Sequence, residues 1–153
     1  MTWPESSDDG PRLRSESTCF GIVLVDHGSR RPESNRMLEE LAVKWQARRS
    51  DTIIEPAHME LASPSISDAF DACVKRGANH VVISPFFLLP GRHWTSDIPR
   101  LAADASLAHP DVSWLLAAPI AMHDLILEIL ESRIDACLIG EQGGPPCDVC
   151  VEQ

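Results

Sequence analysis

The sequence lacks any apolar run of the roughly 20 residues that a helix needs to span a bilayer. Residues 1–18 have neither the basic start and apolar stretch of a secretory signal nor the acid-poor composition of an organellar transit peptide. We therefore expect a soluble protein from which any targeting segment has already been removed.

Basic residues are scarce. The 13 Lys and Arg residues stand against 23 Asp and Glu residues, so the formal net charge is −10. Nucleic-acid binding normally requires a basic surface, and this balance argues against nucleic acid as a partner. An anionic ligand would have to meet a local group of arginines.

The motifs of several common chemistries are missing. No G-x-G-x-x-G follows the first apolar run and no G-x-x-x-x-G-K-[ST] occurs, which removes the main signals of dinucleotide and P-loop nucleotide binding. No G-x-S-x-G elbow is present either, which weakens a serine-hydrolase interpretation.

The five cysteines are odd in number and unlike the framework of a small disulfide-bonded domain, so we expect a reducing compartment. Cys19 and Cys73 lie in apolar contexts typical of buried residues. Cys147 and Cys150 form a C-x-x-C pair, which can share a metal or form a disulfide. One such pair is half of a four-ligand site, which Cys137, another subunit or nothing would complete.

Composition divides the chain into three segments. Residues 1–18 are polar and show no apolar period, which predicts a disordered leader. Residues 140–146 have the composition of a linker or turn, and they begin a flexible tail over 140–153. We expect one domain over residues 19–139, a length sufficient to bury a single core.

Within that domain a strand-like run alternates four times with a helix-like run, the pattern of parallel βα units. The predicted strands are short and continuously apolar, as expected for strands covered on both faces. They cover residues 20–25, 52–57, 80–86 and 112–118. We therefore predict an α/β fold in the order βαβαβαβα, with helices flanking a four-stranded parallel sheet.

The predicted helices follow from apolar stripes and capping signals. The first begins near Pro32, and the second has Ser63 as its N-cap with Pro64 at the first helical position. The third begins near Asp97 and runs to about residue 108, and the fourth begins at about His123.

Most of the histidines follow strands. The carboxyl ends of parallel strands meet at one edge of the sheet, where open α/β folds bind their ligands. That edge is predicted to gather the side chains that follow the four strands: His27, His58 with Glu60, His93, and His123. His80 and His109 fall at the opposite edge.

A metal site is the functional interpretation of this group, because imidazole suits iron, cobalt, nickel and zinc. A structural alternative is that each histidine caps a helix or bonds a loop carbonyl, and it remains most open for His58 and His123. Gly28 and Gly91 adjoin the two favoured histidines and would permit a flat ligand to approach the backbone. The same loops contain arginines that can pair with ligand carboxylates, namely Arg30, Arg31 and Arg92.

Three segments in order resemble a known family. They are VDHGSRRPESN at 25–35, PAHMELASPS at 56–65 and SPFFLLPGRHW at 84–94, followed by DIP at 97–99. They resemble the class II chelatases of the CbiX/SirB kind, most closely the sirohydrochlorin ferrochelatases of plants and related phototrophs. The resemblance covers about residues 21–138.

The resemblance implies a half-length member of a bilobal architecture that forms a homodimer. It implies metal ligands at His27 and His93 and a functional glutamate at Glu60, which is a candidate acceptor of pyrrole protons alongside the histidines. We expect a group of substrate-binding residues around them: Arg30, Arg31, Arg92, Gly28, Ser29, Gly91 and His58. C-terminal cysteines of plant-type members imply an iron–sulfur cluster, which would map onto Cys137, Cys147 and Cys150.

The implied activity is insertion of Fe²⁺ into sirohydrochlorin to form sirohaem, with release of two protons. Cobalt or nickel chelation is the alternative within the enzyme class, since imidazole ligands discriminate weakly among these metals. A metal carrier or sensor that performs no insertion is the alternative from another class. The compartment would be the chloroplast stroma in a plant or alga and the cytoplasm in a bacterium.

Overall fold

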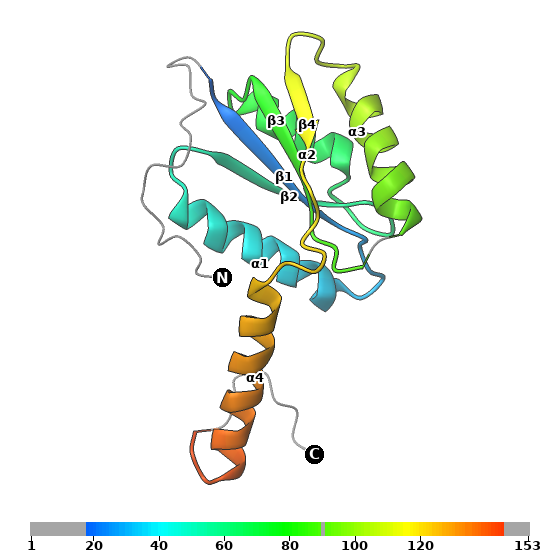
Figure 1. The fold of residues 1–153 in the computed structure, drawn as a ribbon. Coiled ribbons are helices and arrows are strands. Elements are labelled where there is room, and N and C mark those ends of the chain that lie inside the picture. Colours follow the sequence, from blue (N-terminus) through cyan, green and yellow to red (C-terminus); the bar gives the residue numbers. More distant parts are fainter. Residues whose placement is uncertain (1–17, 90, 146–153) are drawn as a thin grey trace. The chain divides into compact units, whose positions relative to one another are not determined.

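The computed structural model describes residues 18–89 and 91–145. Strands and helices alternate as predicted (Figure 1). In chain order the elements are β1 (Phe20–Asp26), α1 (Pro32–Arg48), β2 (Ile53–His58), α2 (Ile66–Lys75), β3 (His80–Pro85), a π-helical turn (His93–Asp97), α3 (Ile98–Ser106), β4 (Ser113–Leu116) and α4 (Leu125–Glu141).

The four strands form one parallel sheet in the order β2-β1-β3-β4. This confirms the predicted α/β fold and its parallel sheet. Since all four strands run the same way, their carboxyl ends share one edge, and the loops after β1, β2 and β3 emerge there. These are the loops that carry the histidines of the predicted site.

Helices cover the two faces of the sheet (Figure 1). On one face the side chains of β1 and β3 pack with those of α2 and α3, and this larger cluster includes Phe70, Ile83 and Ile98. On the other face α1 contributes Leu38 and Ala42, which pack on β1 and β2. The continuously apolar strands identified in the sequence are explained by this two-sided burial.

The second helix begins later than predicted. Its N-cap is Ser65, not Ser63, and Pro64 lies outside the helix. The Ser65 hydroxyl accepts the Asp68 N–H at 3.2 Å and the Asp68 carboxylate accepts the Ser65 N–H at 2.8 Å, which is a capping box. The Pro64 carbonyl accepts the backbone N–H of His58 at 2.8 Å, so Pro64 pairs with the end of β2 and does not enter the helix.

The outer edge of β2 is closed by a side chain. Gln46 of α1 accepts the N–H of Ile54 at 2.9 Å and donates to the carbonyl of Thr52 at 2.7 Å, as a neighbouring strand would. The next outward position is Pro56, which has no N–H, and the one after it is His58, whose N–H is bonded to Pro64. Every outward-facing donor of β2 is therefore absent or satisfied.

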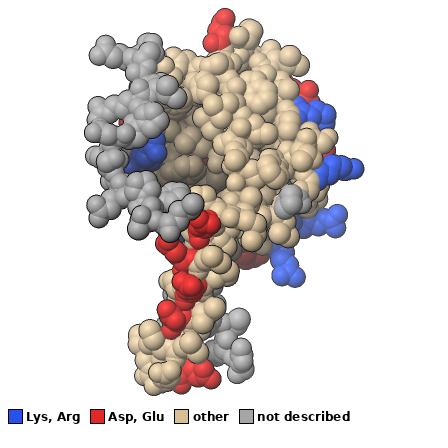
Figure 2. All heavy atoms as spheres, in the orientation of Figure 1, with Lys and Arg blue, Asp and Glu red and all other residues tan. Residues whose placement is uncertain are grey.

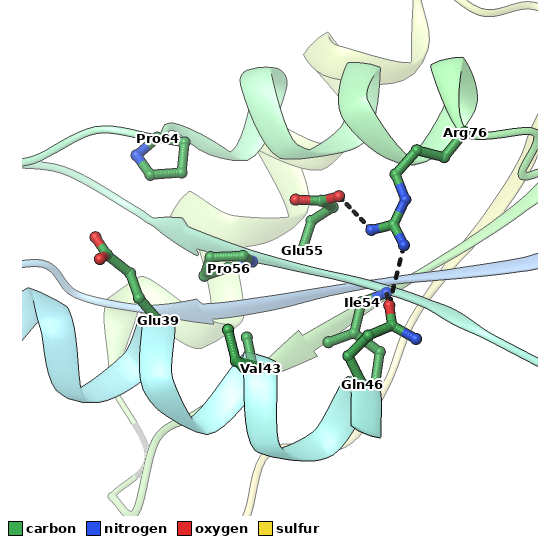
Figure 3. A pocket seen from close by; sticks show the side chains of 9 residues that line it. Glu39, Val43, Gln46, Ile54, Glu55, Pro56, Pro64 and Arg76 are labelled. Carbon is green, nitrogen blue, oxygen red and sulfur yellow. Dashed lines mark hydrogen bonds and ion pairs between the residues drawn. The ribbon is translucent and has the colours of Figure 1, made fainter. Parts of the chain in front are cut away.

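A pocket of about 420 Å³ lies against this edge, between α1 and α2 (Figure 3). Arg76 crosses it to the Glu55 carboxylate at 2.5 Å and to the Gln46 amide oxygen at 3.2 Å. Its lining contains none of the histidines of the predicted site.

The chain divides into two compact units after Pro119, whereas the sequence predicted one domain through Ile139. The second unit contains α4, none of whose residues is buried. Acidic side chains spaced three and four residues apart form a row along it (Figure 2), and most of its other side chains are apolar and exposed. Among the described residues, no helix has the length and hydropathy needed to cross a membrane. Most of the predicted leader, and the tail from residue 146, lie outside the described residues.

Candidate metal centre

His27 stands in the loop that leaves β1. The N–H of Gly28 donates to the Asp26 carboxylate at 2.9 Å, and Gly28 has a φ of +83°, so the chain turns sharply just after His27. Beyond the turn, the Asn35 side chain accepts the N–H of Ser29 at 2.9 Å and donates to its carbonyl at 2.8 Å. These bonds tie the loop to the first turn of α1.

The loop after β2 runs beside the loop after β1. The N–H of Met59 donates to the carbonyl of Asp26 at 2.8 Å, and the N–H of Glu60 donates to the carbonyl of His27 at 3.1 Å. The parallel pairing of β1 and β2 thus continues beyond the strands. It brings Glu60 Oε1 to within 2.8 Å of His27 Nε2, with both side chains partly exposed.

His93 opens the π-helical turn after β3. Its Nδ1–H donates to Asp97 Oδ2 at 2.9 Å, and this bond is the main cause that lowers the pKa of the Asp97 carboxyl. Arg92 Nε lies 3.5 Å from the same oxygen and lowers that pKa further. Because Asp97 engages Nδ1, the hydrogen bond orients the ring and does not use Nε2.

The two favoured histidines meet. The ring centroids of His27 and His93 are 4.9 Å apart, with the planes inclined at 68° in an edge-on arrangement. Their side chains are equally exposed, at 39%. Two imidazoles, each hydrogen-bonded to its own carboxylate, therefore face solvent at the carboxyl edge of the sheet.

The separation of His27 and Glu60 suits a shared metal. Two ligand atoms at right angles around one ion, each about 2.1 Å from it, are about 3.0 Å apart. The 2.8 Å between Nε2 and Oε1 is close to that value, so an ion could replace the proton between them with a small movement. Within 18–89 and 91–145, no group of three or more His, Cys, Asp or Glu side chains is arranged to hold a metal ion.

The other predicted site residues lie in several environments. His58 is fully buried, so in this structure it is not placed to touch a substrate directly. Arg30, Arg31, Arg92 and Gly91 are exposed, and Ser29 is partly buried beside α1.

The remaining histidines have structural partners. His123 belongs to the second unit, where its Nδ1 accepts the N–H of Leu125 at 3.3 Å at the start of α4. At the other edge of the sheet, His80 pairs with Ser113 and His109 stacks on Phe70. The contact of His123 with the start of α4 agrees with the structural alternative, in which this histidine caps a helix.

The predicted cluster ligands lie mostly outside the described residues. This holds for Cys147 and Cys150, whereas Cys137 is exposed on α4. Cys73 is buried below the sheet, and burial raises the pKa of its thiol to about 12.

Two carboxylates of the site were not among the predicted functional residues. Asp97 lies four residues after His93, a spacing at which two side chains meet on one face of a helix. Asp26 directly precedes His27 at the end of a strand. The sequence contained both signals, but a carboxylate beside a histidine is common enough that neither stood out.

A parallel α/β fold with paired histidine and carboxylate side chains at its carboxyl edge offers donor atoms of the kind that bind metal ions. The family model CbiX matches residues 21–137. The chloroplastic sirohydrochlorin ferrochelatase of Arabidopsis thaliana is 53% identical over 91% of this chain and 69% of that protein. The chain belongs to the CbiX family.

More distant members resemble the chain over shorter shares of their length. A sirohydrochlorin cobaltochelatase of Priestia megaterium is 34% identical over 74% of this chain and 37% of its own length. The structure of SirB from Bacillus subtilis with Fe³⁺ superposes with a TM-score of 0.72 at 28% identity, covering 80% of this chain and 48% of SirB. The chain thus spans about half the length of these bacterial relatives.

Proposed function

We propose that this protein is a sirohydrochlorin ferrochelatase, which inserts Fe²⁺ into sirohydrochlorin to form sirohaem and releases two protons. The observation that carries the proposal is the meeting of His27, Glu60 and His93 at the carboxyl edge of the sheet in a chain of the CbiX family. The Arabidopsis relative of that name is 53% identical, whereas the Priestia cobaltochelatase is 34% identical, which favours iron over cobalt.

His27 and His93 bind the metal substrate and present it to one face of the macrocycle. Their imidazole nitrogens are suitable donors for Fe²⁺. The Gly28 carbonyl, 3.1 Å from His27 Nδ1, and the Asp97 carboxylate orient the two rings, and Glu60 Oε1 lies beside His27 Nε2, where it can share the metal. Insertion displaces two pyrrole protons, so a base is required next to the metal. Glu60 is the candidate, since its carboxylate is half exposed and lies against a metal ligand.

The macrocycle carries carboxylates, and the arginines of the site loops are its proposed partners. Arg30 and Arg31 follow His27, and Arg92 precedes His93, so all three flank the metal pair on exposed positions. In a chain of net charge −10, this local excess of positive charge would orient an anionic substrate. Gly28, Ser29 and Gly91 are proposed to border the substrate through their backbone.

A homodimer is the proposed functional unit. The aligned part of this chain covers 48% of SirB, so two copies of that part would correspond to the whole of SirB. Two apolar surfaces support this assembly. One is α4, with Leu127, Ile129 and Ile134 each more than half exposed, and the other is the face of β4 around Leu115, 43% exposed. A parallel sheet is normally covered on both faces, and within the first unit α1 packs mainly on β2 and β1.

The dimer can be tested by light scattering on the full chain. We expect twice the chain mass of 16.8 kDa for the unaltered protein. A change of Ile129→Asp with Ile134→Asp should give monomers, and Glu131→Gln in the acidic row is the matched control. A monomeric mass for the unaltered protein at micromolar concentration would exclude the proposed assembly.

The activity is tested by incubating the protein with sirohydrochlorin and Fe²⁺ under anaerobic conditions and following the absorbance change to sirohaem. The uncatalysed rate is subtracted. We expect His27→Ala and His93→Ala to lose the acceleration, while His80→Ala, at the opposite edge of the sheet, should retain it. Full acceleration in both of the first two variants would exclude their proposed roles.

The same assay separates the alternatives. Competition among Fe²⁺, Co²⁺ and Ni²⁺ at equal free concentrations identifies the preferred metal, and a preference for Co²⁺ would favour a cobaltochelatase. A metal carrier or sensor would bind the metal and leave the spectrum of the macrocycle unchanged.

The iron–sulfur cluster at Cys137, Cys147 and Cys150 stays a prediction. The visible spectrum and acid-labile sulfide of anaerobically purified protein are its test, and the absence of both would exclude it. The chloroplast stroma is the proposed compartment if the source is a plant or alga, by analogy with the Arabidopsis relative.

A further inference from the structure

A buried histidine and a partly buried aspartate form a pair beside the loops that carry His27 and Glu60. His58 has no exposed surface, and its Nδ1–H donates to Asp26 Oδ1 at 2.6 Å. The Asp26 side chain is itself 24% exposed, so the pair lies at the boundary between the core and the site loops. Neither residue belongs to the set proposed to bind the metal.

The burial of the His58 side chain lowers the stability of the fold, so it requires an explanation. His58 and Thr52 are the buried polar residues among those described, and His58 Nε2 is buried without a hydrogen-bond partner among them. A polar atom buried in this way costs about 1–3 kcal/mol, and an apolar side chain of the same size would avoid that cost. The residues before and after His58 in the chain, Ala57 and Met59, are buried and apolar.

The geometry points to what the pair provides. A single oxygen, Asp26 Oδ1, accepts both the Gly28 N–H at 2.9 Å and the His58 Nδ1–H at 2.6 Å. The first bond fixes the turn on either side of His27. The second ties that turn to the end of β2, two residues before Glu60. One carboxylate oxygen therefore connects the backbone segments that carry the two side chains of the metal centre.

Space around the turn is correspondingly tight. A Cβ at Gly28 would lie 3.0 Å from the His58 Cβ and 2.0 Å from the Glu60 carbonyl oxygen. The two loops are thus in direct contact, and a small shift of either would change the distance between His27 and Glu60. Hydrogen bonds that orient metal ligands from behind typically change metal affinity by about 10–100-fold when removed.

We propose that Asp26 and His58 are positioning residues that hold His27 and Glu60 at the separation required for a shared metal ion. The proposal rests on the function proposed above and extends it to a pair that contacts neither metal nor macrocycle. His58 is fully buried and cannot touch the substrate directly, but it can still hold the loops that carry the metal ligands.

Three variants of the full chain test the pair. Asp26→Ala removes both hydrogen bonds, and His58→Phe keeps a buried ring while removing the Nδ1–H. Asp26→Asn is the conservative variant, because its amide oxygen can still accept both hydrogens. His109→Phe is the matched control, since His109 also pairs with an aspartate, at 3.3 Å from Asp71, but lies at the opposite edge of the sheet.

The measurement is titration of metal-free protein with Co²⁺, whose visible absorption reports both affinity and ligand geometry. We expect Asp26→Ala and His58→Phe each to weaken Co²⁺ binding by about 10-fold or more. The double variant should be no weaker than the weaker single variant, because both changes break one connection. Asp26→Asn should recover most of the loss, and His109→Phe should bind Co²⁺ like the unaltered protein.

Unchanged Co²⁺ affinity and spectrum in His58→Phe and Asp26→Ala would overturn the proposal, as would losses that simply add in the double variant. Circular dichroism verifies folding, and if Asp26→Ala does not fold, His58→Phe and Asp26→Asn decide. The titration needs no macrocycle. Protein that fails to metallate sirohydrochlorin yet shows the expected Co²⁺ losses would therefore refute the proposed function and retain the positioning pair.

Discussion

Replacing Gly28 with alanine should damage stability and activity together, because the added methyl group meets two obstacles. Gly28 has a φ of +83°, a left-handed conformation that costs an L-residue about 1–2 kcal/mol. The new Cβ would also lie 2.0 Å from the Glu60 carbonyl oxygen, whereas real Cβ contacts essentially never fall below 3.0 Å. The Glu60 backbone must therefore retreat by at least the difference of about 1 Å.

The displacement of the Glu60 backbone should lower both the stability and the activity of the protein. It breaks the bond from the Glu60 N–H to the His27 carbonyl, now 3.1 Å, which contributes about 1 kcal/mol. With the strain, the free energy of unfolding should fall by about 2–3 kcal/mol. The Glu60 side chain moves away from His27 Nε2, and a misplacement of about 1 Å in an active site lowers the rate roughly 100-fold.

Alanine substitutions at two other glycines distinguish the effect of backbone strain from that of steric overlap. Gly77 has a φ of +103° but nothing within 4 Å of its added Cβ, so Gly77→Ala should lose about 1–2 kcal/mol of stability and no activity. Gly91 has open space and no positive φ, so Gly91→Ala should leave stability within about 0.5 kcal/mol. Urea unfolding measures stability and the sirohaem assay measures the rate. Gly28→Ala with the activity of Gly77→Ala would refute the reasoning.

Three further changes have expected outcomes. Asp97→Asn should lower kcat/KM for metal insertion by about 10-fold, since His93 loses a charged acceptor, and steady-state kinetics would detect it. The Ser65 hydroxyl and backbone hold the pKa of Asp68 below its ordinary value, so the capping box stabilises the fold above about pH 4 and is lost as pH falls through the lowered pKa. The stability deficit of Asp68→Asn in urea unfolding should therefore shrink below about pH 4, and a deficit that grows there would contradict this sign. Gln46→Ala should cost about 1–3 kcal/mol and increase self-association measured by light scattering, because it uncovers the edge of β2.

The sequence predicted the sheet well because the strands are short and mostly apolar and because apolar residues recur every three or four positions in the helices. That pattern predicts a parallel sheet, and parallel strands place their following loops at one edge without further information. On this basis His27, Glu60 and His93 were grouped together with His58 and His123, and the family resemblance singled out His27 and His93. The start of α2 was wrong by two residues, since Ser63 and Ser65 are both acceptable caps and only the tertiary bond from His58 to Pro64 decides between them.

The burial of individual side chains was harder to predict from the sequence than the sheet. His27 and His58 are both histidines at the end of a strand, and the sequence offers no clear difference between them. In the structure His58 is fully buried, whereas the side chain of His27 is 39% exposed. His58 is the last residue of β2 and is buried in the core, whereas Glu60 lies two residues beyond it in a loop, where the alternation of a strand no longer decides which way a side chain points. Asp97 was missed although it lies four residues after His93, because a carboxylate at that distance from a histidine is too common to stand out.

The closed edge of β2 bears on how copies of this chain can associate. An open strand edge recruits further strands one after another, and that mode of growth has no natural end, which is how fibrils arise. In this sheet the amide of Gln46, the proline at position 56 and the bond from His58 to Pro64 leave no outward N–H on β2 to begin such growth. Association through helices, by contrast, can stop at a symmetric pair. A side-chain amide and one imino acid thereby direct the protein away from polymerisation and toward finite assembly.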